Sequence, residues 1–141
     1  MVSKMSFLLR NGVFGCTFLV YVLLLNAGAQ TPNTLPYTPP KTIIQLVDMV
    51  EKEEIVLIDV RTPAEFEQGH LEGAVLIEYQ LIEQEIAKYI MDKDKPIALY
   101  CRSGRRSGIA AAALTAQGYR NVLDIGAYEA LKQAGYPVLE P

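Results

Sequence analysis

The feature that most constrains the fold is a series of short apolar runs separated by segments with helical periodicity. Residues 55–58 (Ile-Val-Leu-Ile) and 97–100 (Ile-Ala-Leu-Tyr) contain no charged side chain, which is typical of strands buried on both faces. Residues 74–77 and 121–125 are expected to form two further short strands. Strands that alternate with helices indicate βαβ units, so we expect a three-layer α/β fold with a parallel sheet of four to five strands and helices on both faces.

Helix signals lie between these runs. Thr62 suits an N-cap, Pro63 suits the first helical position, and Glu65 completes a capping box, so a short helix is expected to begin there. The Ala-rich segment from Ser107 to Gln117 is expected to form a longer helix that stops at the next glycine. The remaining helices are expected over residues 43–53, 82–90 and 128–134.

Residues 1–29 predict a secretory signal peptide. Lys4 and Arg10 precede an uncharged apolar run, Val13–Leu25, and Ala27–Ala29 offers small residues for cleavage. The run is shorter than the roughly 20 residues of a spanning helix. An uncleaved membrane anchor stays the alternative, because no charge lies between Arg10 and Lys41. After cleavage we expect no stable membrane contact.

The remaining chain is expected to form one domain. Residues 30–40 contain four prolines and predict a stiff tether, which leaves 41–141 for the folded domain. The net charge of −3 gives no electrostatic reason to expect nucleic-acid binding. The chain has two cysteines and one histidine, Cys16, Cys101 and His70, and they lie far apart, so we expect no metal and no cofactor.

The loop after residues 97–100 is the strongest candidate for chemistry. It runs directly from a strand end at Cys101 into a helix, so its backbone N–H groups should curl toward the sulfur, and the helix N-terminus adds positive partial charge. We therefore expect the pKa of Cys101 to lie below the free value of about 8.5, giving a nucleophilic thiolate in an anion-binding cradle. The alternative is a small buried hydrophobic cysteine. The cradle residues are Arg102, Ser103, Gly104, Arg105, Arg106 and Ser107.

These residues resemble the rhodanese family, in particular small single-domain sulfurtransferases exported to the periplasm. The resemblance covers about residues 41–138. Three segments carry it: residues 59–74 (Asp-Val-Arg-Thr-Pro-Ala-Glu-Phe, then Gly-His-Leu-Glu-Gly-Ala), the loop 101–107, and 118–138 with its glycines. Because the three segments occur in the order and at the spacing typical of the family, together they form a specific signal.

The resemblance implies a sulfurtransferase that acts through a persulfide. The thiolate of Cys101 would attack the outer sulfur of thiosulfate or a related small donor, and a thiol, cyanide or a protein would accept that sulfur. Arg102 and Arg105 would face the dianionic donor. We favour thiosulfate because family members that use mercaptopyruvate usually have small uncharged residues in place of these arginines. We expect a monomer in the periplasm, or, if the signal is kept, a membrane-anchored protein facing it.

Roles outside the loop are supporting ones. Asp59 ends a strand beside the loop and is expected to pair with a loop arginine such as Arg106, while Arg61 is expected to pair with Glu65; the alternative is that these are purely structural ion pairs. His70 is a candidate base, although the resemblance gives its segment a packing and turn role.

Three other functions share part of this pattern. A cysteine-based phosphatase also cradles an anion, but it needs an arginine six residues after the cysteine, where this chain has Ser107. A persulfide carrier would share every residue named above, and a redox-sensing or binding module would share the fold. Ala127 and Leu131 stand where the family commonly has glycine and tryptophan, which leaves substrate shape and partner docking open.

Overall fold

The structure is a computed structural model that describes residues 37–141. The predicted signal peptide and most of the predicted tether therefore lie outside the described residues. The central sheet has four parallel strands in the order β3-β1-β4-β5. These strands are β1 (Val56–Asp59), β3 (Val75–Leu76), β4 (Ile97–Cys101) and β5 (Val122–Ala127). The predicted parallel sheet is thus confirmed.

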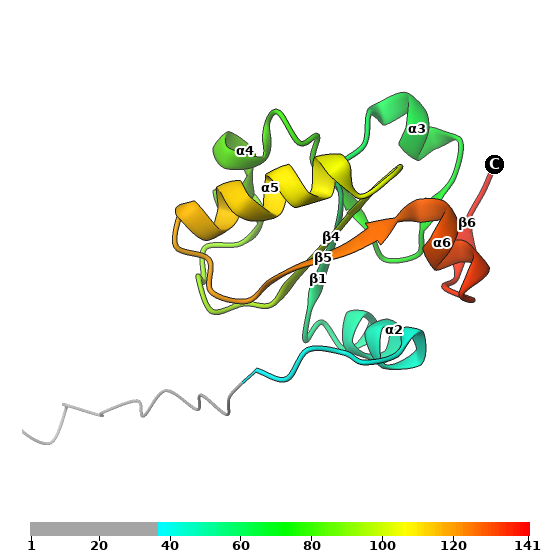
Figure 1. Ribbon diagram of the computed structural model, residues 1–141, viewed down its shortest axis with the longest axis horizontal. Coiled ribbons are helices and arrows are strands. Elements are labelled where there is room, and N and C mark those ends of the chain that lie inside the picture. Colours follow the sequence, from blue (N-terminus) through cyan, green and yellow to red (C-terminus); the bar gives the residue numbers. More distant parts are fainter. Residues whose placement is uncertain (1–36) are drawn as a thin grey trace, which may run out of the picture. The chain divides into compact units, whose positions relative to one another are not determined.

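Helices cover both faces of this sheet, as expected. α4 (Ile82–Tyr89) and α5 (Arg105–Ala116) pack on one face, where they share a core with Ile97, Leu99 and Cys101 of β4. α2 (Ile43–Glu51) and α6 (Tyr128–Gln133) pack on the other, against Ala98 and Tyr100. Figure 1 shows α4 and α5 on one side of the strands and α2 on the opposite side. Successive side chains of a strand point to opposite faces, so β4 supplies both cores and is buried along its whole length.

α3 (Pro63–Glu67) begins with the predicted capping box. The Thr62 hydroxyl accepts a hydrogen bond from the N–H of Glu65, and the Glu65 carboxylate accepts one from the N–H of Thr62. This short helix leads to a second, two-stranded sheet that the sequence patterns do not predict. In it, β2 (His70–Leu71) pairs antiparallel with β6 (Val138–Leu139).

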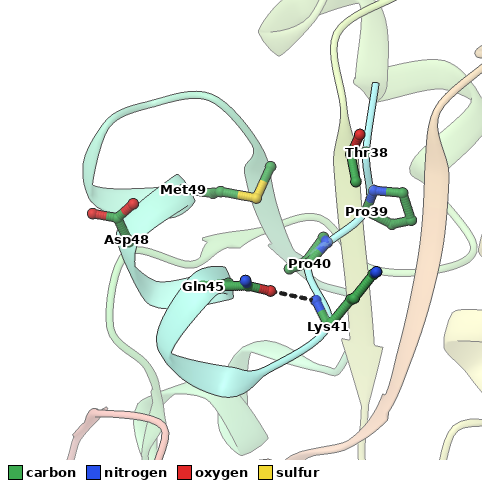
Figure 2. A pocket seen from close by; sticks show the side chains of 7 residues that line it. All are labelled: Thr38, Pro39, Pro40, Lys41, Gln45, Asp48 and Met49. Atoms are coloured by element: carbon green, nitrogen blue, oxygen red, sulfur yellow. Dashed lines mark hydrogen bonds between the residues drawn. The ribbon is translucent and has the colours of Figure 1, made fainter. Parts of the chain in front are cut away.

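The N-terminal end of α2 is also capped. Thr42 accepts a hydrogen bond from the N–H of Gln45, and the Gln45 side chain accepts one from the N–H of Lys41 at 2.8 Å. Figure 2 shows this contact at the edge of a pocket between residues 38–41 and α2. No residue of the 101–107 loop lines the pocket, so it is separate from the cysteine site. Among residues 37–141, none of the helices combines the length and the hydropathy that a membrane span requires.

Candidate active site

Cys101 is the last residue of β4, at the carboxyl edge of the parallel sheet. Ligands of open α/β sheets bind at this edge. The strand passes through only three residues before α5 begins at Arg105, two residues earlier than predicted. Gly104 makes this possible because it takes a left-handed conformation, with φ of 89°, and serves as the N-cap. The loop therefore folds back over the sulfur.

The N–H of Gly104 and the hydroxyl of Ser107 lie within hydrogen-bond distance of the sulfur of Cys101. The N–H of Gly104 donates to Sγ across 3.1 Å. The hydroxyl of Ser107 lies 3.5 Å from Sγ and 3.0 Å from the carbonyl oxygen of Gly104. A hydroxyl has one proton, so Ser107 donates either to the sulfur or to the carbonyl. The proton can turn to the sulfur whenever negative charge develops there.

The electrostatic balance at Cys101 favours the thiolate. Burial acts to raise the pKa of Cys101. The hydroxyl and N–H of Ser107 and the N–H groups of Ser103 and Gly104 outweigh burial, so the pKa of Cys101 lies below its ordinary value. The predicted direction of this shift is therefore confirmed.

The loop arginines fall into two groups. Arg106 forms a bidentate ion pair with Glu65, with both N···O distances at 2.7 Å. Arg102 and Arg105 are exposed, and within residues 37–141 neither guanidinium makes a salt bridge. These two side chains are therefore available to an anion from solvent.

The predicted pairing of the supporting residues is wrong. Asp59 pairs with Arg61, not with Arg106, through N···O contacts of 2.7 to 3.0 Å, and Glu65 takes Arg106 instead of Arg61. Strand alternation explains this. Leu57, two residues before Asp59 and on the same face of β1, belongs to the α2–α6 core, so Asp59 points to the face opposite the Cys101 side chain.

Arg61 is held within that opposite core. Its guanidinium lies 4.3 Å from the ring centre of Tyr128 in α6 and donates to the carbonyl oxygen of Gly69 at 2.7 Å. Tyr100 accepts a hydrogen bond from the N–H of Leu71 on the same side of the sheet. Asp59 and Arg61 therefore form a buried structural pair, the alternative considered for them from the sequence.

His70 is engaged in packing contacts. Its ring stacks on Phe66 with 3.7 Å between ring centres, and its Nδ1 lies 3.0 Å from the Phe66 carbonyl oxygen. Its backbone belongs to β2. This arrangement matches the packing and turn interpretation.

The end of β5 borders the loop. A Cβ added to Gly104 would lie 3.8 Å from the Cα of Gly126, and β5 carries a register shift at this point, where Asp124 and Gly126 pair with consecutive residues of β4. Leu131, at the position where the family commonly has tryptophan, is buried in the α2–α6 core. Ala127, by contrast, pairs with Cys101 in the strand register and adjoins the site directly.

The rhodanese-like domain family matches residues 42–134, well over half of the chain. The chain belongs to the rhodanese-like domain family. Among curated relatives of this rhodanese domain, a sulfurtransferase of Allochromatium vinosum is 37% identical over 94 residues, covering 66% of this chain and 86% of the relative. The thiosulfate sulfurtransferase PspE of Escherichia coli is 38% identical over 69 residues, covering 49% of this chain and 66% of PspE.

A solved structure supports the same assignment of the fold. A rhodanese with anions from E. coli matches this rhodanese domain with a TM-score of 0.56 and 33% sequence identity. The match covers 62% of this chain and 99% of that protein. The family predicted from the sequence is thus confirmed.

Proposed function

We propose that this rhodanese domain transfers the outer sulfur of thiosulfate to a thiophilic acceptor through a persulfide on Cys101. The observation that carries the proposal is the contact of the sulfur with two donors, the N–H of Gly104 and the hydroxyl of Ser107. An activated thiolate at the N-terminus of a helix is suited to nucleophilic attack. The relatives named sulfurtransferases support the same class of reaction.

The first half-reaction forms the persulfide. The Cys101 thiolate attacks the outer sulfur of thiosulfate, a new S–S bond forms, and the bond between the two thiosulfate sulfurs breaks. The electron pair of that bond leaves with sulfite, and the negative charge moves to the outer sulfur of the persulfide. Preorganised N–H donors stabilise such charge without reorganisation, and here they are those of the loop.

The second half-reaction returns the thiolate. Cyanide or an acceptor thiolate attacks the outer sulfur, the persulfide S–S bond breaks, and its electron pair stays on Cys101. With cyanide the product is thiocyanate. Sulfite leaves before the acceptor reacts, so a ping-pong pattern is expected.

Arg102 and Arg105 would bind the dianionic donor. Both are exposed, and Arg105 opens α5. Substitution of either by Gln should raise KM for thiosulfate more than it lowers kcat. The effect should weaken at high salt, because exposed charges are screened.

Two alternative activities can be tested beside sulfur transfer. Hydrolysis of an aryl phosphate tests the phosphatase alternative, and we expect none because Ser107 replaces the arginine that such enzymes require. The test of the main proposal is steady-state formation of thiocyanate from thiosulfate and cyanide, with Cys101→Ala as the control. Parallel double-reciprocal lines that vanish in the control support it. Hydrolysis of the aryl phosphate without thiocyanate would favour the phosphatase, and a persulfide that forms but turns over poorly would favour the carrier.

We also propose that the protein is a monomer that acts in the periplasm after removal of residues 1–29. The support is the basic flank, apolar run and small residues of that segment. N-terminal sequencing of exported protein and its elution volume in gel filtration test these two statements. Retention in the membrane fraction with an intact N-terminus would favour the anchor.

A further inference from the structure

The start of α5 breaks a local preference of helices. Arg105 and Arg106 are its first two residues, and no acidic residue lies in its first turn. Positive charge at a helix N-terminus is unfavourable because the helix dipole is positive there. Departures of this kind concentrate at functional sites and are compensated elsewhere in the fold. For Arg106 the compensation comes from α3.

Both carboxylate oxygens of Glu65 in α3 accept hydrogen bonds. Its Oε2 accepts from Nη1 of Arg106 and its Oε1 from Nη2, both at 2.7 Å. The same carboxylate accepts from the N–H and the hydroxyl of Thr62 at 3.0 and 3.1 Å. The side chains of Arg106 and Glu65 are only 20% and 25% exposed. A paired, planar guanidinium in such a fork has little freedom to move.

Arg106 lies in the chain between the two groups that face the sulfur. Gly104 precedes it by two residues and Ser107 follows it directly, and both contact the sulfur of Cys101. Restraint of Arg106 therefore restrains the segment that carries both donors. Glu65 and, to a smaller degree, Cys101 raise the pKa of Arg106 against the effect of burial, in keeping with a guanidinium close to both groups.

We propose that Glu65 is a positioning residue for sulfur transfer: through Arg106 it holds residues 104–107 so that their donors stay aimed at the Cys101 sulfur. The inference rests on the sulfur transfer proposed above. It also gives the loop arginines different roles. Arg102 and Arg105 bind the donor, whereas the guanidinium of Arg106 is already engaged in its bidentate ion pair with Glu65.

The test uses Glu65→Gln in the full chain. Glutamine keeps a carbonyl oxygen for the capping box, so α3 keeps its N-terminal contacts, but the ion pair with Arg106 is lost. The matched control is Glu67→Gln, the same change at an exposed position of the same helix. Two readouts are needed: kcat and KM for thiosulfate, and the pH dependence of Cys101 alkylation by iodoacetamide, assigned by peptide mapping.

The charges that bear on this pH dependence come from several elements. Besides Glu65 and Arg106, they are Arg102 and Arg105 of the loop and α5, and Asp124 of β5. The carboxylate of Asp124 would lie 3.3 Å from a Cβ added to Gly108. None of these other groups changes in Glu65→Gln. Loss of the Glu65 negative charge alone would move the alkylation profile to lower pH, so a shift to higher pH reports the lost positioning of the donors.

We expect kcat to fall about tenfold in Glu65→Gln, with KM within about twofold of wild type, as for lost charge-assisted hydrogen bonds that act on the chemical step. The midpoint of alkylation should move to higher pH. Arg106→Gln should reproduce both changes, and the double variant should add little to either, because the two side chains act as one unit. Glu67→Gln should match wild type.

The inference is overturned if Glu65→Gln and Arg106→Lys both keep the wild-type kcat and alkylation profile, even if their melting temperatures fall. A folding defect in Glu65→Gln does not block the test, because Arg106→Lys keeps the positive charge and loses only the bidentate geometry of the guanidinium. If the wild-type protein does not turn over thiosulfate, the proposed function fails. The alkylation profile still decides the role of Glu65, because it needs no sulfur donor.

Discussion

The hydroxyl of Ser107 lies 3.5 Å from the sulfur of Cys101 and 3.0 Å from the carbonyl oxygen of Gly104. One proton serves two acceptors, and the charge on the sulfur decides between them. In the thiol the carbonyl is the better acceptor. In the thiolate and in the persulfide the sulfur competes for the proton. The hydroxyl thus follows the charge through the proposed reaction.

Ser107→Ala should raise the pKa of Cys101, because the side chain of Ser107 is the foremost of the contacts that lower it. A hydrogen bond of this kind is worth about 1 kcal/mol, so alkylation at neutral pH should slow on the order of fivefold. The measurement is the iodoacetamide rate against pH. A profile that superposes on that of wild type would show that the hydroxyl serves only the Gly104 carbonyl. Ser103→Ala is the control, since Ser103 is exposed and acts through its backbone N–H.

Gly104→Ala should impair both the fold and the site. The space for a methyl group exists, since the nearest atom to an added Cβ is 3.8 Å away, but φ of 89° is strained for any residue with a Cβ. We expect a loss of about 1 kcal/mol in unfolding free energy, or several degrees in melting temperature, and slower alkylation of Cys101 as the N–H donor shifts. Gly118→Ala, with φ of 92° and open space around it, should cost similar stability without the change in alkylation. Equal alkylation in both variants would count against the Gly104 contact.

Asp59→Asn should affect stability far more than chemistry. The Asp59–Arg61 pair is buried, and removal of one partner from such a pair costs roughly 3–5 kcal/mol. Urea unfolding should show this loss, while the alkylation profile of the folded protein stays that of wild type, because the pair lies on the opposite face of the sheet. The control is Asp94→Asn at an exposed ion pair with Arg120, where little change is expected. A shifted alkylation profile in Asp59→Asn would show that Asp59 supports the Cys101 loop after all, as the sequence predicted.

Acid should destabilise the protein partly through Glu65. Its hydrogen bonds from Arg106, opposed by burial and helped by Thr62, lower its pKa from 4.5 to about 2. A group with a lowered pKa stabilises the folded state above its unfolded pKa and loses that contribution as pH falls toward its folded pKa. The contribution of Glu65 should therefore be complete above about pH 5 and disappear between pH 4.5 and 2. Unfolding free energy measured against pH should fall less steeply over this range in Glu65→Gln than in Glu67→Gln, and equal slopes would contradict the shift.

Local signals in the sequence predicted most of the fold. The apolar runs of β1 and β4, the capping box at Thr62 and the Ala-rich α5 each depend on residues close together in the chain. The pairing of β2 with β6 was missed because each strand has only two residues and the two strands lie far apart in the chain. Two residues do not form a recognisable alternation.

The ion pairs of the site were predicted with the right residues but with the wrong partners. Both the expected pairs and the observed ones use Asp59, Arg61, Glu65 and Arg106, but with the partners exchanged. Spacing alone did not separate the two arrangements. The exchange depends on which face of the sheet each side chain leaves, and the alternation along β1 was the available signal. The sequence predicted that α5 begins at Ser107. The helix begins two residues earlier, at Arg105, because Gly104 takes a left-handed conformation.

Both half-reactions proposed above require that Cys101 carries the transferred sulfur. The most direct measurement is the intact mass of the reduced protein after thiosulfate, with and without cyanide, beside Cys101→Ala, which keeps Cys16 if residues 1–29 are retained. We expect a gain of one sulfur atom in wild type only, located on Cys101 by peptide mapping and removed by cyanide as thiocyanate forms. A reduced Cys101 that alkylates readily yet gains no sulfur, or a gain that persists in Cys101→Ala, would contradict it.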